Sequence, residues 1–253
     1  MTQGPPTLTA ERDGALLVVQ LARPAKRNAM NLAMAAELMA VLDELSGVRA
    51  LVLTGDERAF SAGADLSEML SGVPEGPTWH DVLPALAGLP IPTIAAIEGW
   101  CLGGGLELAL TCDLRVAARD AQLGTPEVQR GIFPGGGGTQ RLARLLGAAR
   151  AKELMFLGDA MSGAEAAAWG LVNRVTEPGA ALATALELAQ RLAAAATVAI
   201  ATIKGLVDDG LDVDLATGLA LERSRGQAVI ESTDAREGVT AFLERRPARF
   251  EGR

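Results

Sequence analysis

Two glutamates in this 253-residue chain stand beside glycine clusters. Glu107 follows Gly103–Gly105 in "WCLGGGLELALTCD", and Glu127 precedes Gly135–Gly138 in "QLGTPEVQRGIFPGGGGTQRL". Glycine lets a backbone N–H approach a ligand with no Cβ in the way. Where such a turn opens a helix, its free N–H groups carry a partial positive charge. A turn of this kind can hold a phosphate, or a carbonyl oxygen that becomes negative during a reaction.

The phosphate alternative is the weaker one for this chain. Neither GxxxxGK[ST] nor GxGxxG with an acidic residue further on occurs in the sequence. A carboxylate in the first turn of the helix, at Glu107, would repel a phosphate but suits proton transfer beside a polarised carbonyl. The segment by itself is also compatible with a tight turn and a capping acid.

Two further segments favour the carbonyl alternative. "FSAGADLSEM" (Phe60–Met69) places a second small-residue turn after a strand, so a second N–H could converge on the same oxygen. Glu127 follows a Thr-Pro corner, and Gly135–Gly138 taken alone is a flexible turn that opens a helix near Thr139. Together the segments predict two backbone donors and two carboxylates on loops at the edge of one core.

The elements that must hold these loops alternate along the chain. Short apolar runs that end in glycine or proline predict buried parallel strands, and apolar residues at helical spacing predict helices packed outside them. Asn31 is a candidate N-cap for the first helix. The predicted strands are 15–21, 49–55, 92–99, 114–118 and 170–175, and the predicted helices are 31–45 and a segment from the glycines to about 110. After Pro178 the pattern is helical.

Composition and charge exclude several classes of protein. The net charge is −8, which argues against a nucleic-acid partner because such proteins need a basic footprint. No uncharged apolar stretch of membrane length and no signal peptide is recognised, so we expect a cytoplasmic protein with no membrane partner. Cys101 and Cys112 are interpreted as buried free thiols rather than metal ligands. His80, the one histidine, falls in a predicted mobile loop, Ser71–Asp81, where we expect it to be solvated.

The ordered set of motifs resembles a known family. Gly63-Ala64-Asp65, Gly103–Glu107, Pro126-Glu127 and "PGGGGTQRL" resemble the signature segments of the crotonase family, most closely those of enoyl-CoA hydratases. The resemblance extends from "RPAKRNAMN" to "AFLERRPARF". It implies an α/β fold, with a crotonase-like spiral of ββα units over residues 1–190 and a helical C-terminal trimerisation region over 191–253.

The resemblance also implies an activity and its catalytic residues. The substrate would be an acyl-CoA thioester whose carbonyl oxygen lies between the N–H groups of Ala64 and Gly104. Glu107 would take a proton from water adding at C3, and Glu127 would protonate C2. No metal or redox cofactor is needed, since CoA is part of the substrate.

Contacts to CoA follow from the same resemblance. Ala62 and Arg58 match positions near CoA, and Phe242 and Arg245 match an aromatic and a basic residue that reach it from a neighbouring subunit of a homotrimer or a dimer of trimers. Arg58 and Arg245 could instead be solvated charges. Ser67 stands where the family often has a CoA-binding lysine, so one contact is missing.

Other chemistries on the same fold remain open at this stage. A Δ3,Δ2-enoyl-CoA isomerase needs only the second glutamate, and other acyl-CoA lyases, such as a carnityl-CoA dehydratase, share the same parts. A dehalogenase would need an aspartate nucleophile and a nearby histidine. A non-catalytic acyl-CoA-binding protein would be expected to lose one glutamate. Because both Glu107 and Glu127 are present, we favour the hydratase.

Overall fold

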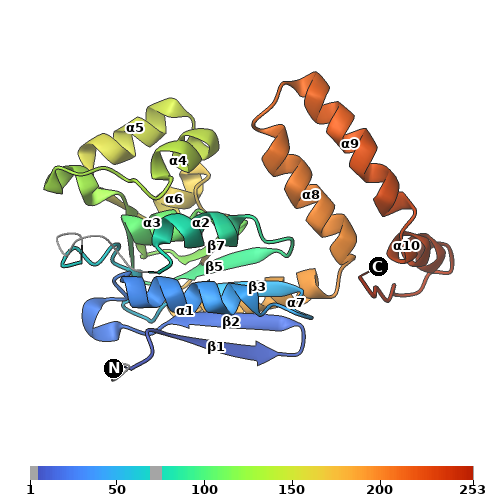
Figure 1. Ribbon diagram of the computed structural model, residues 1–253, viewed down its shortest axis with the longest axis horizontal. Helices are drawn as coiled ribbons and strands as arrows, with labels where there is room; N and C mark the ends of the chain where they lie inside the picture. The colour runs from blue at the N-terminus through green and yellow to red at the C-terminus, as the bar shows by residue number, and fades with distance from the viewer. Residues whose placement is uncertain (1–4, 69–75, 253) are drawn as a thin grey trace.

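The larger of two sheets forms the centre of the molecule. The structure is a computed structural model that describes residues 5–68 and 76–252 (Figure 1). The strand order is β1-β2-β3-β5-β7-β10, and every neighbouring pair is parallel except the β1–β2 hairpin. The predicted parallel sheet with helices packed outside it is therefore confirmed, and the hairpin is an addition. The strands are β1 (Leu8–Asp13), β2 (Leu16–Leu21), β3 (Ala50–Thr54), β5 (Thr93–Ile97), β7 (Leu114–Ala118) and β10 (Arg174–Thr176).

A smaller sheet, which the sequence analysis did not predict, lies beside it. Its strands are β4 (Ala59–Ser61), β6 (Trp100–Leu102), β8 (Gln122–Gly124) and β9 (Ala160–Ser162), in that order. β4, β6 and β8 run parallel, and each follows a strand of the larger sheet along the chain. The predicted strand 92–99 is confirmed as β5, but the expectation that only a glycine turn separates it from the helix is wrong. The chain leaves β5 at Ile97, turns at Gly99 with φ 55°, and forms β6 before the helix begins.

Gly99 is required at this turn for two reasons. Its positive φ is one that side-chain-bearing residues rarely adopt. A Cβ at this position would also lie 2.0 Å from the Arg58 carbonyl oxygen. The turn therefore lets the chain pass from one sheet to the other.

Helices cover both faces of the larger sheet. α1 (Leu32–Asp43), α2 (Trp79–Ala87) and α3 (Gly104–Ala109) pack with one face, and α7 (Ala181–Ala193) packs on the other. Strand β3 supplies both cores because successive side chains alternate: Leu51 and Leu53 join the first, Ala50 and Val52 the second. α7 approaches closely because it presents an alanine at every fourth position, namely 181, 185, 189 and 193.

Two local expectations are settled by the structure. Asn31 caps α1, since its side chain accepts a hydrogen bond from the Met34 N–H at 3.1 Å. Cys101 and Cys112 are buried free thiols, as predicted. The remaining helices of the body are α4 (Gly138–Leu146), α5 (Ala148–Leu157) and α6 (Gly163–Trp169), with 3-10 turns η1 (Pro24–Lys26) and η2 (Pro126–Arg130).

The C-terminal helices extend away from the sheets. α8 (Thr197–Gly210) and α9 (Leu215–Ile230) form a hairpin that leads to α10 (Thr233–Leu243) (Figure 1). Lys204 of α8 pairs with Asp113 at 3.0 Å, and Arg49 donates to the Ala195 carbonyl at 2.7 Å. The division at residue 190 stays a prediction; α7 spans it.

Among the described residues no single helix is long and apolar enough to cross a membrane. α7 and α8 taken together have the length and composition of a span, but the chain bends by 109° between them.

Candidate active site

The candidate site lies where three neighbouring strands of the smaller sheet end. β4, β6 and β8 are parallel, so the segments that follow them emerge at the same edge. Those segments carry Ala62–Asp65 after β4, Gly103 and Gly104 after β6, and Glu127 after β8. Segments far apart in sequence thus meet because the short strands bring them together.

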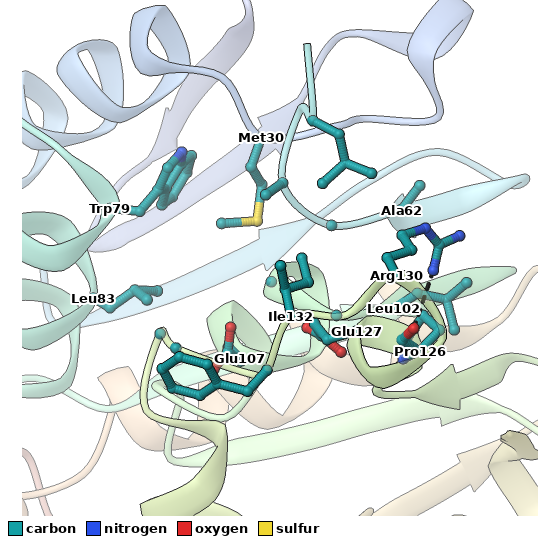
Figure 2. A pocket seen from close by; sticks show the side chains of 18 of the residues that line it. Met30, Ala62, Trp79, Leu83, Leu102, Glu107, Pro126, Glu127, Arg130 and Ile132 are labelled. Carbon is teal, nitrogen blue, oxygen red and sulfur yellow. Dashed lines mark hydrogen bonds between the residues drawn. The ribbon is translucent and has the colours of Figure 1, made fainter. Parts of the chain in front are cut away.

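A cavity of about 640 Å³ opens at this edge. This volume is within the usual range for small-molecule sites. Its apolar lining comes from Met30, Leu66, Trp79, Leu83, Leu102, Ile132 and Phe133. Figure 2 shows Trp79 and Leu83 at one end, Ala62 and Arg130 at the other, and the two glutamates between them.

Two backbone amides, those of Ala64 and Gly104, line the cavity close together. A Cβ built on Gly104 would lie 3.2 Å from the Ala64 nitrogen, and one on Gly63 would lie 3.3 Å from the Gly104 nitrogen. Met30 pairs with the neighbours of Ala64, accepting from Asp65 N–H and donating to the Gly63 carbonyl. The pairing leaves the amide of Ala64 itself free. Within the described residues, neither the Ala64 nor the Gly104 N–H donates to a protein acceptor.

The Ala64 turn is fixed by a partly buried ion pair beside it. Arg23 donates to Asp65 at 2.9 Å, with 18% and 12% of the two side chains exposed. Ser67 also donates to Asp65, at 2.6 Å. These hydrogen bonds, Ser67 first and Arg23 second, lower the pKa of Asp65, so its carboxylate stays ionised as an anchor.

Glu107 is buried in the first turn of α3, where it is 4% exposed. Its Oε1 accepts the Gly138 N–H at 2.8 Å, at the N-terminus of α4. Cβ atoms on Gly136 and Gly138 would lie 2.8 and 2.9 Å from its two carboxylate oxygens. Gly136 and Gly138 are therefore required by close packing on Glu107, which the interpretation of 135–138 as a flexible turn did not include. The predicted helix near Thr139 is confirmed, since α4 begins at Gly138.

Opposing effects act on the acidity of Glu107. Burial raises its pKa, and this effect is the larger. The amides of Gly138 and Gly136, and then the positive charges of Arg141 and His80, act in the opposite direction. Donors and cations are thus arranged around the carboxylate to favour its ionised form against the cost of burial.

Glu127 is buried in a different environment. It lies in the first turn of η2, is 8% exposed, and its Oε2 has no hydrogen-bond partner among the described residues. Burial raises its pKa, and the negative charge of Glu107 raises it further. A Cβ on Gly103 would lie 2.8 Å from its Oε1, so this glycine too makes room for a carboxylate. The surroundings of Glu127 favour the protonated acid.

The structure brings five of the predicted site residues to this cavity. Ala62, Ala64, Gly104, Glu107 and Glu127 all line it. The three other predicted CoA contacts do not line the cavity of this chain: Arg58 is exposed near β4, Phe242 is 82% exposed at the end of α10, and Arg245 is exposed just beyond it.

The predicted loop Ser71–Asp81 is partly wrong. Its residues 71–75 lie outside the described residues, but Trp79–Asp81 form the first turn of α2. Thr78 and Asp81 make a capping box there, with Thr78 N–H to Asp81 at 2.8 Å. His80 therefore lies on a helix and lines the cavity, although it is exposed, as expected.

Several cavity residues were missed from sequence. Trp79 and Leu83 stand one helical turn apart on α2, a spacing that places both on one face. That spacing was the available signal, and it was hidden because the segment was interpreted as a loop. Nothing in the sequence pattern singled out Met30, Arg130 or Ile132, which reach the cavity through tertiary packing.

Comparison with known proteins agrees with this geometry. The sequence profile described as enoyl-CoA hydratase/isomerase matches residues 11–253. A short-chain-enoyl-CoA hydratase of Clostridium acetobutylicum is 40% identical over 245 residues, covering 93% of this chain and 94% of that protein. A mitochondrial methylglutaconyl-CoA hydratase of Mus musculus is 40% identical over 255 residues, covering 96% and 81%.

A solved structure extends the agreement to three dimensions. The crystal structure of an enoyl-CoA hydratase from Bacillus anthracis matches with a TM-score of 0.92 and 38% identity, covering 98% of this chain and 100% of that one. The match confirms the expected crotonase fold. From its profile match, its relatives and its fold, the chain belongs to the enoyl-CoA hydratase/isomerase family, the crotonases.

Proposed function

We propose that this protein is an enoyl-CoA hydratase that adds water, with syn geometry, across the double bond of trans-2-enoyl-CoA thioesters to give 3-hydroxyacyl-CoA. One observation carries the proposal: two buried carboxylates, Glu107 and Glu127, face a cavity that also presents the free amides of Ala64 and Gly104. The names of the two hydratase relatives support it.

The two amides would bind the thioester oxygen. When water adds at C3, electron density moves through C2 to this oxygen, and an enolate-like charge develops there. Donors already in place stabilise that charge without reorganisation, and losing one of them typically costs about 3–4 kcal/mol. Gly104 adds the partial positive charge at the start of α3.

The two glutamates would divide the proton transfers. Glu107, held by amide donors, takes a proton from water as the hydroxyl oxygen bonds to C3. Glu127, as the carboxylic acid, gives its proton to C2 when the enolate collapses. Return of the proton from Glu107 to Glu127 through solvent restores the starting state. No metal or redox cofactor enters this scheme, because CoA arrives as part of the substrate.

The two ends of the cavity suit the two ends of an acyl-CoA. Trp79 and Leu83 form an apolar end for the acyl chain, and the opposite end carries Arg130, a cation able to attract a CoA phosphate (Figure 2). We place the pantetheine arm past Ala62 on this side. Ser67, where a lysine is common, instead hydrogen-bonds Asp65, so Arg130 is a candidate to supply the missing charge.

The proposal includes assembly into a homotrimer or a dimer of trimers. α8 and α9 contain no buried residue. Ile203 and Val207 of α8 and Leu211, its C-cap residue, are exposed at four-residue spacing and form one apolar face. Packing against another copy would cover this face. It would also bring Phe242 and Arg245 toward the CoA of a neighbouring subunit.

Hydration of crotonyl-CoA by the purified protein tests the activity. We expect loss of the conjugated enoyl thioester absorbance and formation of 3-hydroxybutyryl-CoA. Conversion of a 3-enoyl-CoA without hydration would instead favour the isomerase. Turnover of neither substrate, with acyl-CoA still bound, would leave a binding protein and contradict the proposal.

A further inference from the structure

Arg141 lies outside the cavity but contacts the turn that holds Glu107. It stands on the first turn of α4, and its Nη1 donates to the Gly136 carbonyl at 3.0 Å. Gly137, the N-cap of α4, has φ 103°. A Cβ there would fall 2.2 Å from Nη1 of Arg141, so the guanidinium occupies the space that a side chain at 137 would need.

The glycine turn is held from both sides. On one side, the Glu107 carboxylate accepts from Gly138 N–H at 2.8 Å and lies where Cβ atoms on Gly136 and Gly138 would be. On the other side, the guanidinium of Arg141 packs on Gly137 and fixes the Gly136 carbonyl. These two contacts restrain the backbone just before the Gly138 N–H, which donates to the Glu107 carboxylate.

The charge of Arg141 is not neutralised by an ion pair in the described part of the chain. Burial lowers the pKa of Arg141, and the charge of Glu107 opposes this effect. The reciprocal interaction lowers the pKa of Glu107 against the effect of its burial. Two other titratable groups face Glu107, His80 from α2 and Glu127 from η2.

We propose that Arg141 is a positioning residue for Glu107: its guanidinium holds the turn 135–138 against the carboxylate and places a positive charge beside it. The inference rests on the proposed hydratase function. Arg141 acts through Glu107 and does not touch the substrate.

The test is the pH dependence of kcat for crotonyl-CoA hydration in Arg141→Gln and Arg141→Lys. The base Glu107 must be ionised, so activity falls as the pH drops through its pKa. Removing the positive charge raises that pKa, so the acid-side limb of Arg141→Gln moves to higher pH. The loosened turn also lowers kcat, by up to about 10²-fold, the effect of a misplacement of about 1 Å. KM changes little.

Arg141→Lys separates charge from geometry. Lysine keeps the positive charge but lacks the planar, forked guanidinium. We therefore expect the acid-side limb of the pH profile at the wild-type position and a reduced kcat. Arg144→Gln is the matched control: Arg144 lies three residues further on α4, pairs with Asp212 at 3.2 Å, and should leave both readouts unchanged. Repeating the series in a His80→Gln background removes the other basic side chain whose charge acts on Glu107.

The outcomes distinguish this inference from the proposed function. A wild type that does not hydrate crotonyl-CoA contradicts the function. If the wild type is active and Arg141→Gln folds, an unchanged acid-side limb of the pH profile contradicts the proposed role of Arg141, whether or not kcat falls. The proposed hydratase function would stand. If Arg141→Gln does not fold, Arg141→Lys decides: a limb shifted from the wild-type position overturns the proposal, and an unshifted limb with reduced kcat supports it.

Discussion

Burial acts on both glutamates of the site, yet their hydrogen bonding differs. Glu107 accepts a backbone N–H at the start of α4, whereas Glu127 Oε2 has no partner in the described part of the chain. Burial raises the pKa of both side chains, but backbone donors and the charge of Arg141 act against this effect at Glu107, whereas the charge of Glu107 adds to it at Glu127. One of them suits a general base, and the other suits a general acid.

Glu107→Gln and Glu127→Gln should each reduce hydration strongly. A general acid or base typically contributes about 10²–10⁴-fold, and glutamine cannot exchange the proton. Because the two act as a unit, the double variant should be little worse than the poorer single variant. Single-turnover kinetics with crotonyl-CoA measure these losses. If Glu107→Gln kept most of its activity on a 3-enoyl-CoA while Glu127→Gln was inactive, the enzyme would be an isomerase instead.

Gly136→Ala tests the packing of the glycine turn on Glu107. The added methyl would lie 2.8 Å from Glu107 Oε2 and 2.9 Å from Leu83, so the carboxylate must move. We expect kcat to fall by about 10²-fold. Gly135→Ala is the comparison, because its Cβ meets Phe133 no closer than 3.6 Å, and it should lose far less. Equal losses in the two variants would show that the collision with Glu107 is not the cause.

Trp79 should limit the length of the acyl chain. Its Nε1 donates to the Asn31 carbonyl at 3.1 Å, which fixes the indole at the apolar end of the cavity. Trp79→Ala should raise the kcat/KM of trans-2-octenoyl-CoA relative to crotonyl-CoA by about 10-fold or more, since a single methylene in a pocket is worth about 10–200-fold. Trp79→Phe, which keeps a ring, should change the ratio less. An unchanged ratio in a folded Trp79→Ala would place the acyl chain elsewhere.

At the scale of elements, the buried strands of five or six residues were predictable, whereas the largely exposed strand β1 and the three-residue strands of the smaller sheet were not. The strands β3, β5 and β7 are mostly apolar runs of five residues, long enough to be recognised. β4, β6 and β8 have three residues each, too few for any periodicity to appear. The segments that carry Ala64, Gly104 and Glu127 were found by residue type. The sheet that brings them together depends on pairing between distant residues, which a local pattern does not contain.

The alanine stripe of α7 gives a prediction about stability. Ala189 is fully buried against the larger sheet, so Ala189→Leu forces three extra carbons into a packed layer. Such overpacking typically costs about 1–3 kcal/mol. Urea denaturation should show this loss in the free energy of unfolding. Ala183→Leu is the matched control, because Ala183 is exposed on the same helix and its variant should unfold like the wild type.

At the scale of the whole molecule, the body and the C-terminal helices differ in how they bury apolar side chains. Both faces of the larger sheet are covered within the chain. The C-terminal helices instead expose large apolar residues, among them Leu215 at 78%, Ile230 at 70% and Phe242 at 82%. Exposed apolar surface on this scale marks an interaction site. The helical pattern after Pro178 predicted the helices, but not which faces the body would leave uncovered.

The exposed face of α8 should be an interface between copies of this chain. The double variant Ile203→Glu/Val207→Glu places two carboxylates at positions whose side chains are 62% and 58% exposed, so the isolated chain should still fold. Burial of these charges in an interface would be costly, so the assembly should weaken. We expect sedimentation velocity to show a trimer or hexamer for the wild type and a smaller species for the variant. Gln190→Glu is the control, because Gln190 is exposed on α7, and this variant should sediment like the wild type. Thr202 on α8 is less suitable because its hydroxyl donates a hydrogen bond to the Val198 carbonyl. A wild type that sediments as a monomer at micromolar concentration would contradict the assembly.

If Phe242 and Arg245 contact CoA across subunits, the variant should also show a raised KM for crotonyl-CoA, because a separated chain loses both contacts while Glu107 and Glu127 remain in place.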